Sequence, residues 1–160
     1  MERPVRKSIR LPSEAYVLAG TAWHVSISTA DRIPAFEDPV FGGLVAAIFE
    51  ERATVMDVGL DLYCFMPDHV HLLVQIKTAG LVDFIRDVKS RATREWWSFD
   101  GAGPLWQRSF HDHGIRTPSD YESAISYILY NPVRTGLAAS WGSFPLIGGA
   151  LISVQPASNS

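Results

Sequence analysis

Two apolar runs with a two-residue break between them constrain the fold more than any other feature of this chain. Residues 57–66 and 69–76 are both rich in β-forming side chains, and only Pro67-Asp68 separates them. A break this short, built from two turn-forming residues, predicts a β-hairpin. Because hairpin strands run antiparallel, we expect the sheet that contains them to be mainly antiparallel.

The rest of the chain alternates between strand and helix patterns. Residues 22–28 alternate apolar and polar side chains and predict a strand, whereas residues 39–56 and 81–97 carry apolar residues at helical spacing. Residues 105–116 are expected to hold one or two short strands, and residues 118–130 a third helix. This order of elements predicts an α+β fold, in which helices pack on a mainly antiparallel sheet.

Local signals place the helix ends. Asp38 and Thr117 are expected N-caps, and each is followed by a proline at the first helical position. The third helix is expected to end near Asn131-Pro132, because the residue before a proline disfavours helical geometry.

Length and composition fit one globular domain. The chain has 160 residues, of which 47% are hydrophobic and 19% charged. No apolar run reaches the roughly 20 residues of a membrane helix, and no secretory signal is found, so no membrane partner is expected. The single cysteine, Cys64, fits a reducing cytoplasm and excludes a Cys-rich zinc site. We expect a basic arm at 1–20, the domain at 21–147, and a partly disordered C-terminal tail at 148–160.

The distribution of charge allows a nucleic-acid partner, although the net charge of −3 argues mildly against one. Two clusters of basic residues are candidates for DNA binding, one in the N-terminal arm and one on the second predicted helix. Their members are Arg6, Lys7 and Arg10, and Lys89, Arg91 and Arg94. The alternative is that both clusters are solvated surface.

The tripeptide His69-Val70-His71 is the first candidate for chemistry. Residues two apart in a strand point to the same face, so the two imidazoles could bind one divalent ion. Asp68 could accept a hydrogen bond from one ring and orient it. Two ligands are too few for a closed site, so a third must come from elsewhere in the chain. The alternative is a histidine pair on a half-exposed strand face.

The third helix offers that ligand together with a nucleophile. Tyr127 and Asn131 are four residues apart and share a helix face. An amide oxygen suits Mg²⁺ or Mn²⁺, and a helix that brings Asn131 to an ion brings the Tyr127 hydroxyl close as well. A phenolate beside a metal could attack a phosphodiester. Spacing alone leaves Tyr121 and Tyr130 as competitors.

Several segments resemble a known family. Residues 63–74, YCFMPDHVHLLV, are similar to the signature of HUH-superfamily single-tyrosine transposases, a group that includes the IS200-like family. Residues 127–137, YILYNPVRTGL, resemble a segment of its REP-associated branch. Residues 105–110 and 112–116, with Trp23-His24-Val25, resemble strands of the same proteins.

The resemblance implies a ferredoxin-like sandwich with the tyrosine helix beside the histidine strand. It further implies a single-stranded DNA endonuclease and strand transferase that cuts hairpin or palindromic repeat DNA through a 5′-phosphotyrosine. Tyr127 matches the nucleophile, His69, His71 and Asn131 match the ligands of Mg²⁺ or Mn²⁺, and Arg134 either contacts phosphate or caps the turn after the helix. A monomer is slightly favoured, and a cytoplasmic, nucleoid-associated location is expected.

Two other functions stay open at this point. The chain could be a catalytically silent regulator that binds repeat DNA on the same fold. It could also be a metal-dependent hydrolase that uses water in place of Tyr127.

Overall fold

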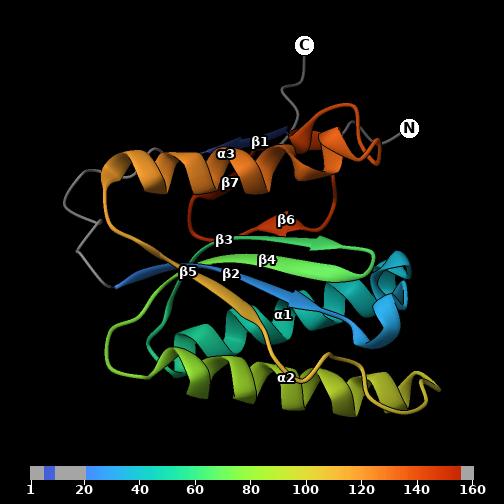
Figure 1. The fold of residues 1–160 in the computed structure, drawn as a ribbon. Helices are drawn as coiled ribbons and strands as arrows, with labels where there is room; N and C mark the ends of the chain where they lie inside the picture. The colour runs from blue at the N-terminus through green and yellow to red at the C-terminus, as the bar shows by residue number, and fades with distance from the viewer. Residues whose placement is uncertain (1–5, 10–20, 156–160) are drawn as a thin grey trace.

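A five-stranded antiparallel sheet forms the centre of the molecule (Figure 1). The structure is a computed structural model and describes residues 6–9 and 21–155. The strands follow the order β5-β2-β4-β3-β6, and every neighbouring pair is antiparallel. They are β2 (Ala22–Ser28), β3 (Gly59–Met66), β4 (His69–Gln75), β5 (His111–Ile115) and β6 (Ile147–Gly148). The β3–β4 hairpin around Pro67-Asp68 is therefore confirmed.

Helices cover both faces of this sheet. α1 (Pro39–Val55) and α2 (Leu81–Ser98) lie on one face, and α3 (Pro118–Arg134) lies on the other (Figure 1). The order β2-α1-β3-β4-α2-β5, with β2 and β4 central, is the ferredoxin-like arrangement. The expected α+β sandwich is thus confirmed, and α3 is an additional layer that the family resemblance had anticipated.

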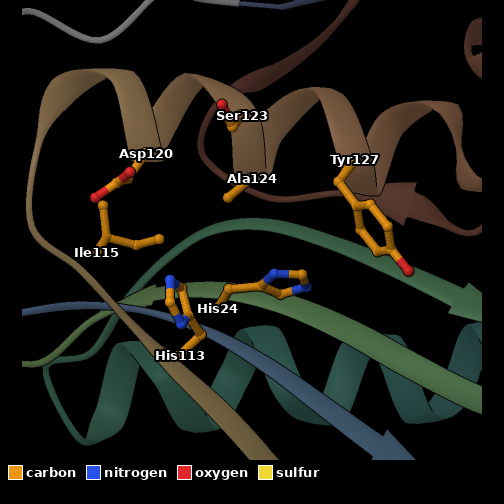
Figure 2. Close-up of a pocket in the computed structure, with 7 residues that line it drawn as sticks. All are labelled: His24, His113, Ile115, Asp120, Ser123, Ala124 and Tyr127. Carbon is orange, nitrogen blue, oxygen red and sulfur yellow. The ribbon is translucent and has the colours of Figure 1, made fainter.

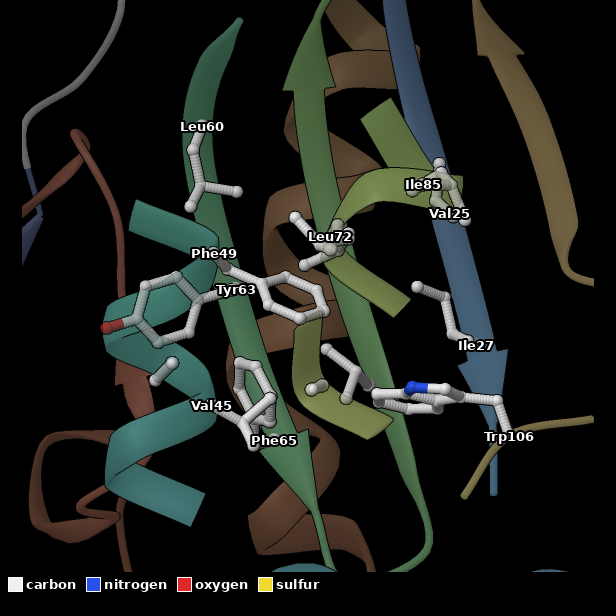
Figure 3. Close-up of a cluster of buried hydrophobic side chains, with 14 of the residues drawn as sticks. Val25, Ile27, Val45, Phe49, Leu60, Tyr63, Phe65, Leu72, Ile85 and Trp106 are labelled. Atoms are coloured by element: carbon white, nitrogen blue, oxygen red, sulfur yellow. The ribbon is translucent and has the colours of Figure 1, made fainter. Parts of the chain in front are cut away.

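Each face of the sheet has its own hydrophobic core. Val25, Phe65 and Leu72 point toward α1 and α2, where they pack with Phe49 and Trp106 (Figure 3). The opposite side chains of the same strands form a second cluster with α3. Its strand members include Leu62, Cys64, Met66 and Leu73. Because β3 and β4 are buried on both faces, their register against each other is strongly fixed.

Both predicted N-caps are confirmed. The Asp38 carboxylate accepts from the backbone N–H of Val40 at 2.9 Å, and the Thr117 hydroxyl accepts from that of Asp120 at 3.1 Å. The predicted end of the third helix is wrong, since α3 continues through Pro132 to Arg134. Proline removes one backbone donor, but the following turn still closes with the Thr135 N–H on the Asn131 carbonyl at 3.1 Å.

A second, two-stranded sheet joins parts of the two predicted terminal segments. β1 (Arg6–Ile9) pairs antiparallel with β7 (Ile152–Gln155). The Lys7 ammonium donates to the carbonyl oxygens of Phe144 at 2.6 Å and Ile147 at 3.2 Å. The division of the chain at residues 20 and 147 stays a prediction. Within the described ranges, no helix is long and apolar enough to cross a membrane.

A buried carboxylate fixes the start of α3 on the sheet. Asp61, at the beginning of β3, is only 8% exposed, and it accepts hydrogen bonds from the Tyr121 hydroxyl at 2.5 Å and the Gln75 amide at 2.8 Å. Burial raises the pKa of Asp61, while these two donors oppose that rise. The carboxylate therefore depends on the tyrosine for its stability.

We predict that Tyr121→Phe lowers the free energy of unfolding by about 1–3 kcal/mol, because it leaves a buried carboxylate short of a donor. Denaturant titration measures this change. Tyr130→Phe is the matched control on the same helix, since Tyr130 is 48% exposed, and its effect should stay within about 0.5 kcal/mol. Equal effects of the two substitutions would contradict this role of Asp61.

Candidate active site

All five histidines of the chain lie on the face of the sheet that α3 covers. In β2, Ser26 is opposite both His71 of β4 and His111 of β5. The neighbouring rows place His69 opposite Ser28 and His113 opposite His24. Directly opposed residues share a face, and residues two apart along a strand share it too. The β2 register thus gathers histidines from three strands under one helix.

His71 is the most buried of these histidines and is held in place by two neighbours. It is 5% exposed, and its Nδ1 lies 2.9 Å from the Ser26 hydroxyl and 3.2 Å from the His24 Nε2. Burial, and then the nearby His69, His24 and Arg134, lower the pKa of His71 to about 3. The ring is therefore neutral at physiological pH, the form in which histidine binds metals.

His69 is oriented in a similar way. Its Nδ1 lies 2.8 Å from Asp68 Oδ1, while the other Asp68 oxygen pairs with the Arg32 guanidinium at 3.0 Å. Burial raises the pKa of Asp68, but the bonds from His69 and Arg32 outweigh it and hold that pKa below its usual value. The centroids of the His69 and His71 rings are 4.9 Å apart, so the two rings share a face as the spacing predicts.

Tyr127 approaches this cluster from α3. Its ring centroid is 5.4 Å from that of His71 and 5.6 Å from that of His24, and its side chain is half exposed. The Arg134 guanidinium lies over the tyrosine ring at 4.6 Å and donates to the Tyr127 carbonyl at 2.6 Å. The site therefore combines an accessible phenol, neutral imidazole and a fixed cation.

The other two tyrosines of α3 differ from Tyr127 in their surroundings. Tyr121 is buried, and burial together with its bond to Asp61 raises the pKa of its hydroxyl. Tyr130 is exposed to a similar degree as Tyr127. The ring contacts found in the described part of the chain bring Tyr127 alone of the three against histidines. The choice of Tyr127 stays a prediction, and this geometry supports it.

The donors around the two histidines fit a divalent ion. Both Nδ1 atoms are engaged by neighbouring side chains, which leaves the two Nε2 atoms as ligands in the manner of known metal sites. Asn131 is 7% exposed, and its Nδ2 has no hydrogen-bond partner. A half-turn of the carboxamide exchanges nitrogen and oxygen, so this buried position can present an oxygen.

The position of Asn131 along α3 agrees with this assignment. Asn131 follows Tyr127 by four residues, about 6 Å along the helix axis. Among the described residues, no three His, Cys, Asp or Glu side chains form a metal cluster. An ion at this site would therefore need the amide oxygen or water beside the two imidazoles.

A pocket opens next to the tyrosine, between α3 and the edge of the sheet. Its volume is about 350 Å³. Figure 2 shows the His24 ring directed toward Tyr127, with His113 on the sheet below and Asp120 at the far end of the helix. The lining residues are His24, His113, Ile115, Asp120, Ser123, Ala124 and Tyr127.

The residues predicted to bind DNA are separated by the fold. Lys89 donates to the Gln107 carbonyl at 2.7 Å, and Arg91 pairs with Asp87 at 3.3 Å. These two residues and Arg94 lie on α2, across the sheet from Tyr127. Of the predicted set, Arg134 alone touches Tyr127 in the described structure.

The structure describes the predicted basic arm only in part. Lys7 is engaged by carbonyl oxygens, and burial lowers its pKa. Arg10 and the side chain of Arg6 lie outside the described residues.

His24 is the functional candidate that the sequence missed. Its strand was recognised as similar to the family, but the residue was not assigned to the site, because its contacts with His71 and Tyr127 come from distant parts of the chain. The signal that could have found it is the alternation in residues 22–28, which puts His24, Ser26 and Ser28 on one face.

We predict that Lys7→Gln destabilises the fold by about 1–2 kcal/mol, because its ammonium donates to carbonyl oxygens of residues 144 and 147. Thermal or denaturant unfolding measures the loss. The control is Lys77→Gln, since the Lys77 side chain is 56% exposed and pairs with Asp57 only at 3.4 Å. If the Lys7 variant is as stable as the control, the hydrogen bonds of Lys7 do not stabilise the fold, which would contradict this prediction.

Comparison with known proteins agrees with the geometry. Residues 18–128 match the family model described as "Transposase IS200 like". A protein of Haemophilus influenzae, provisionally named a REP-associated tyrosine transposase, is 34% identical over 88 residues, 46% of this chain and 48% of that protein. The chain thus matches about half the length of this relative. The REP-associated tyrosine transposase of Escherichia coli K12 is 24% identical over 133 residues, which cover 81% of this chain and 77% of that protein.

Two solved structures share the fold. One is a REP-associated tyrosine transposase bound to a REP hairpin, with a TM-score of 0.70 and 19% identity over 82% of this chain and 78% of that one. The other is a provisionally named transposase from Deinococcus radiodurans R1, with a TM-score of 0.53 and 23% identity over 75% of this chain and 95% of that one.

Proposed function

The chain belongs to the family of IS200-like transposases, and on that premise we propose that it cuts and rejoins single-stranded DNA at hairpin repeats, with Tyr127 as the nucleophile. The observation that carries the proposal is the Tyr127 ring, which is half exposed and lies 5.4 Å from the ring of His71. The relative solved with a REP hairpin supports hairpin DNA as the partner.

The proposed reaction is a displacement at phosphorus. The Tyr127 oxygen, having lost its proton, forms a bond to the phosphorus of a DNA phosphodiester. The bond from phosphorus to the 3′ oxygen breaks, and that oxygen leaves with the electron pair and takes up a proton. The products are a 5′-phosphotyrosine and a free 3′-OH. Attack by the 3′-OH on the phosphotyrosine rejoins the strand, so no external energy source is required.

His69, His71 and Asn131 are the proposed ligands of Mg²⁺ or Mn²⁺. Bound there, the ion would polarise the phosphodiester and stabilise charge on its non-bridging oxygens. Asp68 and Ser26 orient the two imidazoles through their Nδ1 atoms.

Arg134 is proposed to act on both the tyrosine and the DNA. Its guanidinium lies 4.6 Å from the centre of the Tyr127 ring and holds this side chain beside the histidines. The same group is exposed and can contact a phosphate of the bound strand.

We expect the wild-type protein, incubated with a labelled hairpin oligonucleotide and Mn²⁺, to form a covalent adduct that survives denaturation. Tyr127→Phe should abolish the adduct, because phenylalanine has no nucleophilic oxygen. Tyr130→Phe is the matched control and should retain it. Denaturing gel electrophoresis gives the yield.

Each alternative function has its own outcome in this assay. Cleavage by the wild type without an adduct would favour a hydrolase that uses water. Binding of the hairpin without cleavage at any Mn²⁺ concentration would favour a silent regulator. An adduct that persists in Tyr127→Phe would place the nucleophile elsewhere.

We predict that Asp68→Asn weakens binding of Mn²⁺ by roughly 10- to 100-fold, because the carboxylate orients His69. Isothermal titration calorimetry measures the affinity. Asp57→Asn is the matched control, since Asp57 is exposed and its ion-pair partner in the described part of the chain is the similarly exposed Lys77. If the Asp68 variant binds Mn²⁺ as tightly as the control, Asp68 does not contribute to metal binding through His69.

A further inference from the structure

The pocket beside Tyr127 is not used by the proposed chemistry. It lies between α3 and the β2–β5 edge of the sheet, and its volume of about 350 Å³ is in the lower part of the range of small-molecule sites. Tyr127 and His24 form one end, so a group in the pocket would lie directly beside the nucleophile (Figure 2). The distance along α3 from Tyr127 to Asp120 at the other end is about 10 Å.

The lining combines flat rings, an apolar floor and polar atoms. His24, His113 and Tyr127 supply the rings, on which a planar group can stack. Ile115 and Ala124 are buried and apolar and complete the lining. This combination is what a planar heterocycle with polar edges requires.

Besides the two histidines of the sheet, three polar side chains of the pocket belong to α3. Asp120, Ser123 and Tyr127 follow each other at spacings of three and four residues, so they share one helix face. The Asp120 carboxylate accepts hydrogen bonds only, whereas the Ser123 hydroxyl can donate or accept.

The charge of the lining disfavours a phosphate as the occupant. Among the described residues, no lysine or arginine lines the pocket, and Asp120 would repel an anion. The backbone of a bound DNA strand is therefore expected at the Tyr127 end, near Arg134, with a base directed into the pocket. Carboxylates recognise bases by accepting a hydrogen bond from an exocyclic amino group, as with the N4 amine of cytosine.

We propose that this pocket holds one unpaired base next to the cleaved phosphate, and that Asp120 selects a base with an exocyclic amino group over thymine. The proposal rests on the proposed function for the identity of the DNA. Adenine, cytosine and guanine each carry an exocyclic amino group that can donate to the carboxylate. Thymine has none, and the two carbonyl oxygens that flank its single ring N–H repel the carboxylate. The base must be unstacked to enter, which single-stranded DNA beside a hairpin permits at low cost.

Binding measured without chemistry tests the selection. The probes are fluorescent hairpin oligonucleotides with short single-stranded flanks, in which each flank position carries A, C, G or T in turn. In a Tyr127→Phe background, we expect thymine at one flank position to weaken binding by about tenfold. Asp120→Asn should reduce that difference to less than about twofold, because an amide can donate to the thymine oxygen as well as accept.

Glu122→Gln is the matched control. Glu122 is two residues away on the same helix and lines a separate pocket on the outer surface of α3, which it shares with Ser123, Tyr127 and Arg134. Glu122 does not line the base pocket, so its substitution removes the same charge beside the bound DNA. Any general effect of that charge should change the binding of all four probes alike, and the discrimination against thymine should persist.

The binding results distinguish base selection by Asp120 from a structural role of this residue. Equal binding of all four bases at every flank position overturns the selection, whether or not wild-type protein cuts DNA. Asp120 also lies in the first turn of α3 and could act only by stabilising this helix. In that case Asp120→Asn would lower the melting temperature and weaken the binding of all four probes equally, and this result would also overturn the proposed selection. Selection against thymine without any covalent adduct in the wild type would keep the inference and reject the proposed reaction.

Discussion

The pairing of β2 with β4 is the interaction on which the site depends. It places Ser26 opposite His71 and Ser28 opposite His69, and it brings His24 close enough to contact the His71 ring. A slip of β4 by one residue would turn His69 and His71 toward α1 and α2. The buried apolar residues on the other face of these strands prevent such a slip. The rigidity of the core is thus what holds the imidazoles in place.

The placement of α3 is the second constraint. Thr117 caps its start, and Tyr121 is bonded to the buried Asp61, so the rotation of the helix about its axis is set before the chain reaches Tyr127. Less than two turns after Tyr121, the phenol meets His71 and His24. Two tyrosines on one helix therefore have separate tasks, since one anchors the helix and the other is available for chemistry.

Periodicity was enough to predict the parts of the fold that depend on local sequence. The strand at 22–28, the hairpin at Pro67-Asp68 and both N-caps follow from patterns within a few residues, and the structure confirms them. The shared face of His69 and His71 follows from the two-residue repeat of a strand. The end of α3 was mispredicted, because the helix continues through the buried Pro132 and its last turn still closes with the Thr135 N–H on the Asn131 carbonyl.

Contacts between distant segments were beyond the reach of local patterns. The role of His24 depends on the register of β2 against two other strands, and no sequence spacing encodes that register. The same holds for Lys7, which was predicted to bind DNA, although its ammonium lies among carbonyl oxygens of residues more than 130 positions away in the sequence. The roles of the metal ligands and the nucleophile remain predictions, supported by geometry and by family membership.

The central claim is that one chain supplies both Tyr127 and the histidines of a single site. Mixing two inactive variants, Tyr127→Phe and His71→Ala, with a labelled hairpin and Mn²⁺ tests it most directly. If each site is built within one chain, the mixture forms no more covalent adduct than either variant alone. Restoration of the adduct in the mixture would contradict the account, because the tyrosine and the histidines would then come from different chains.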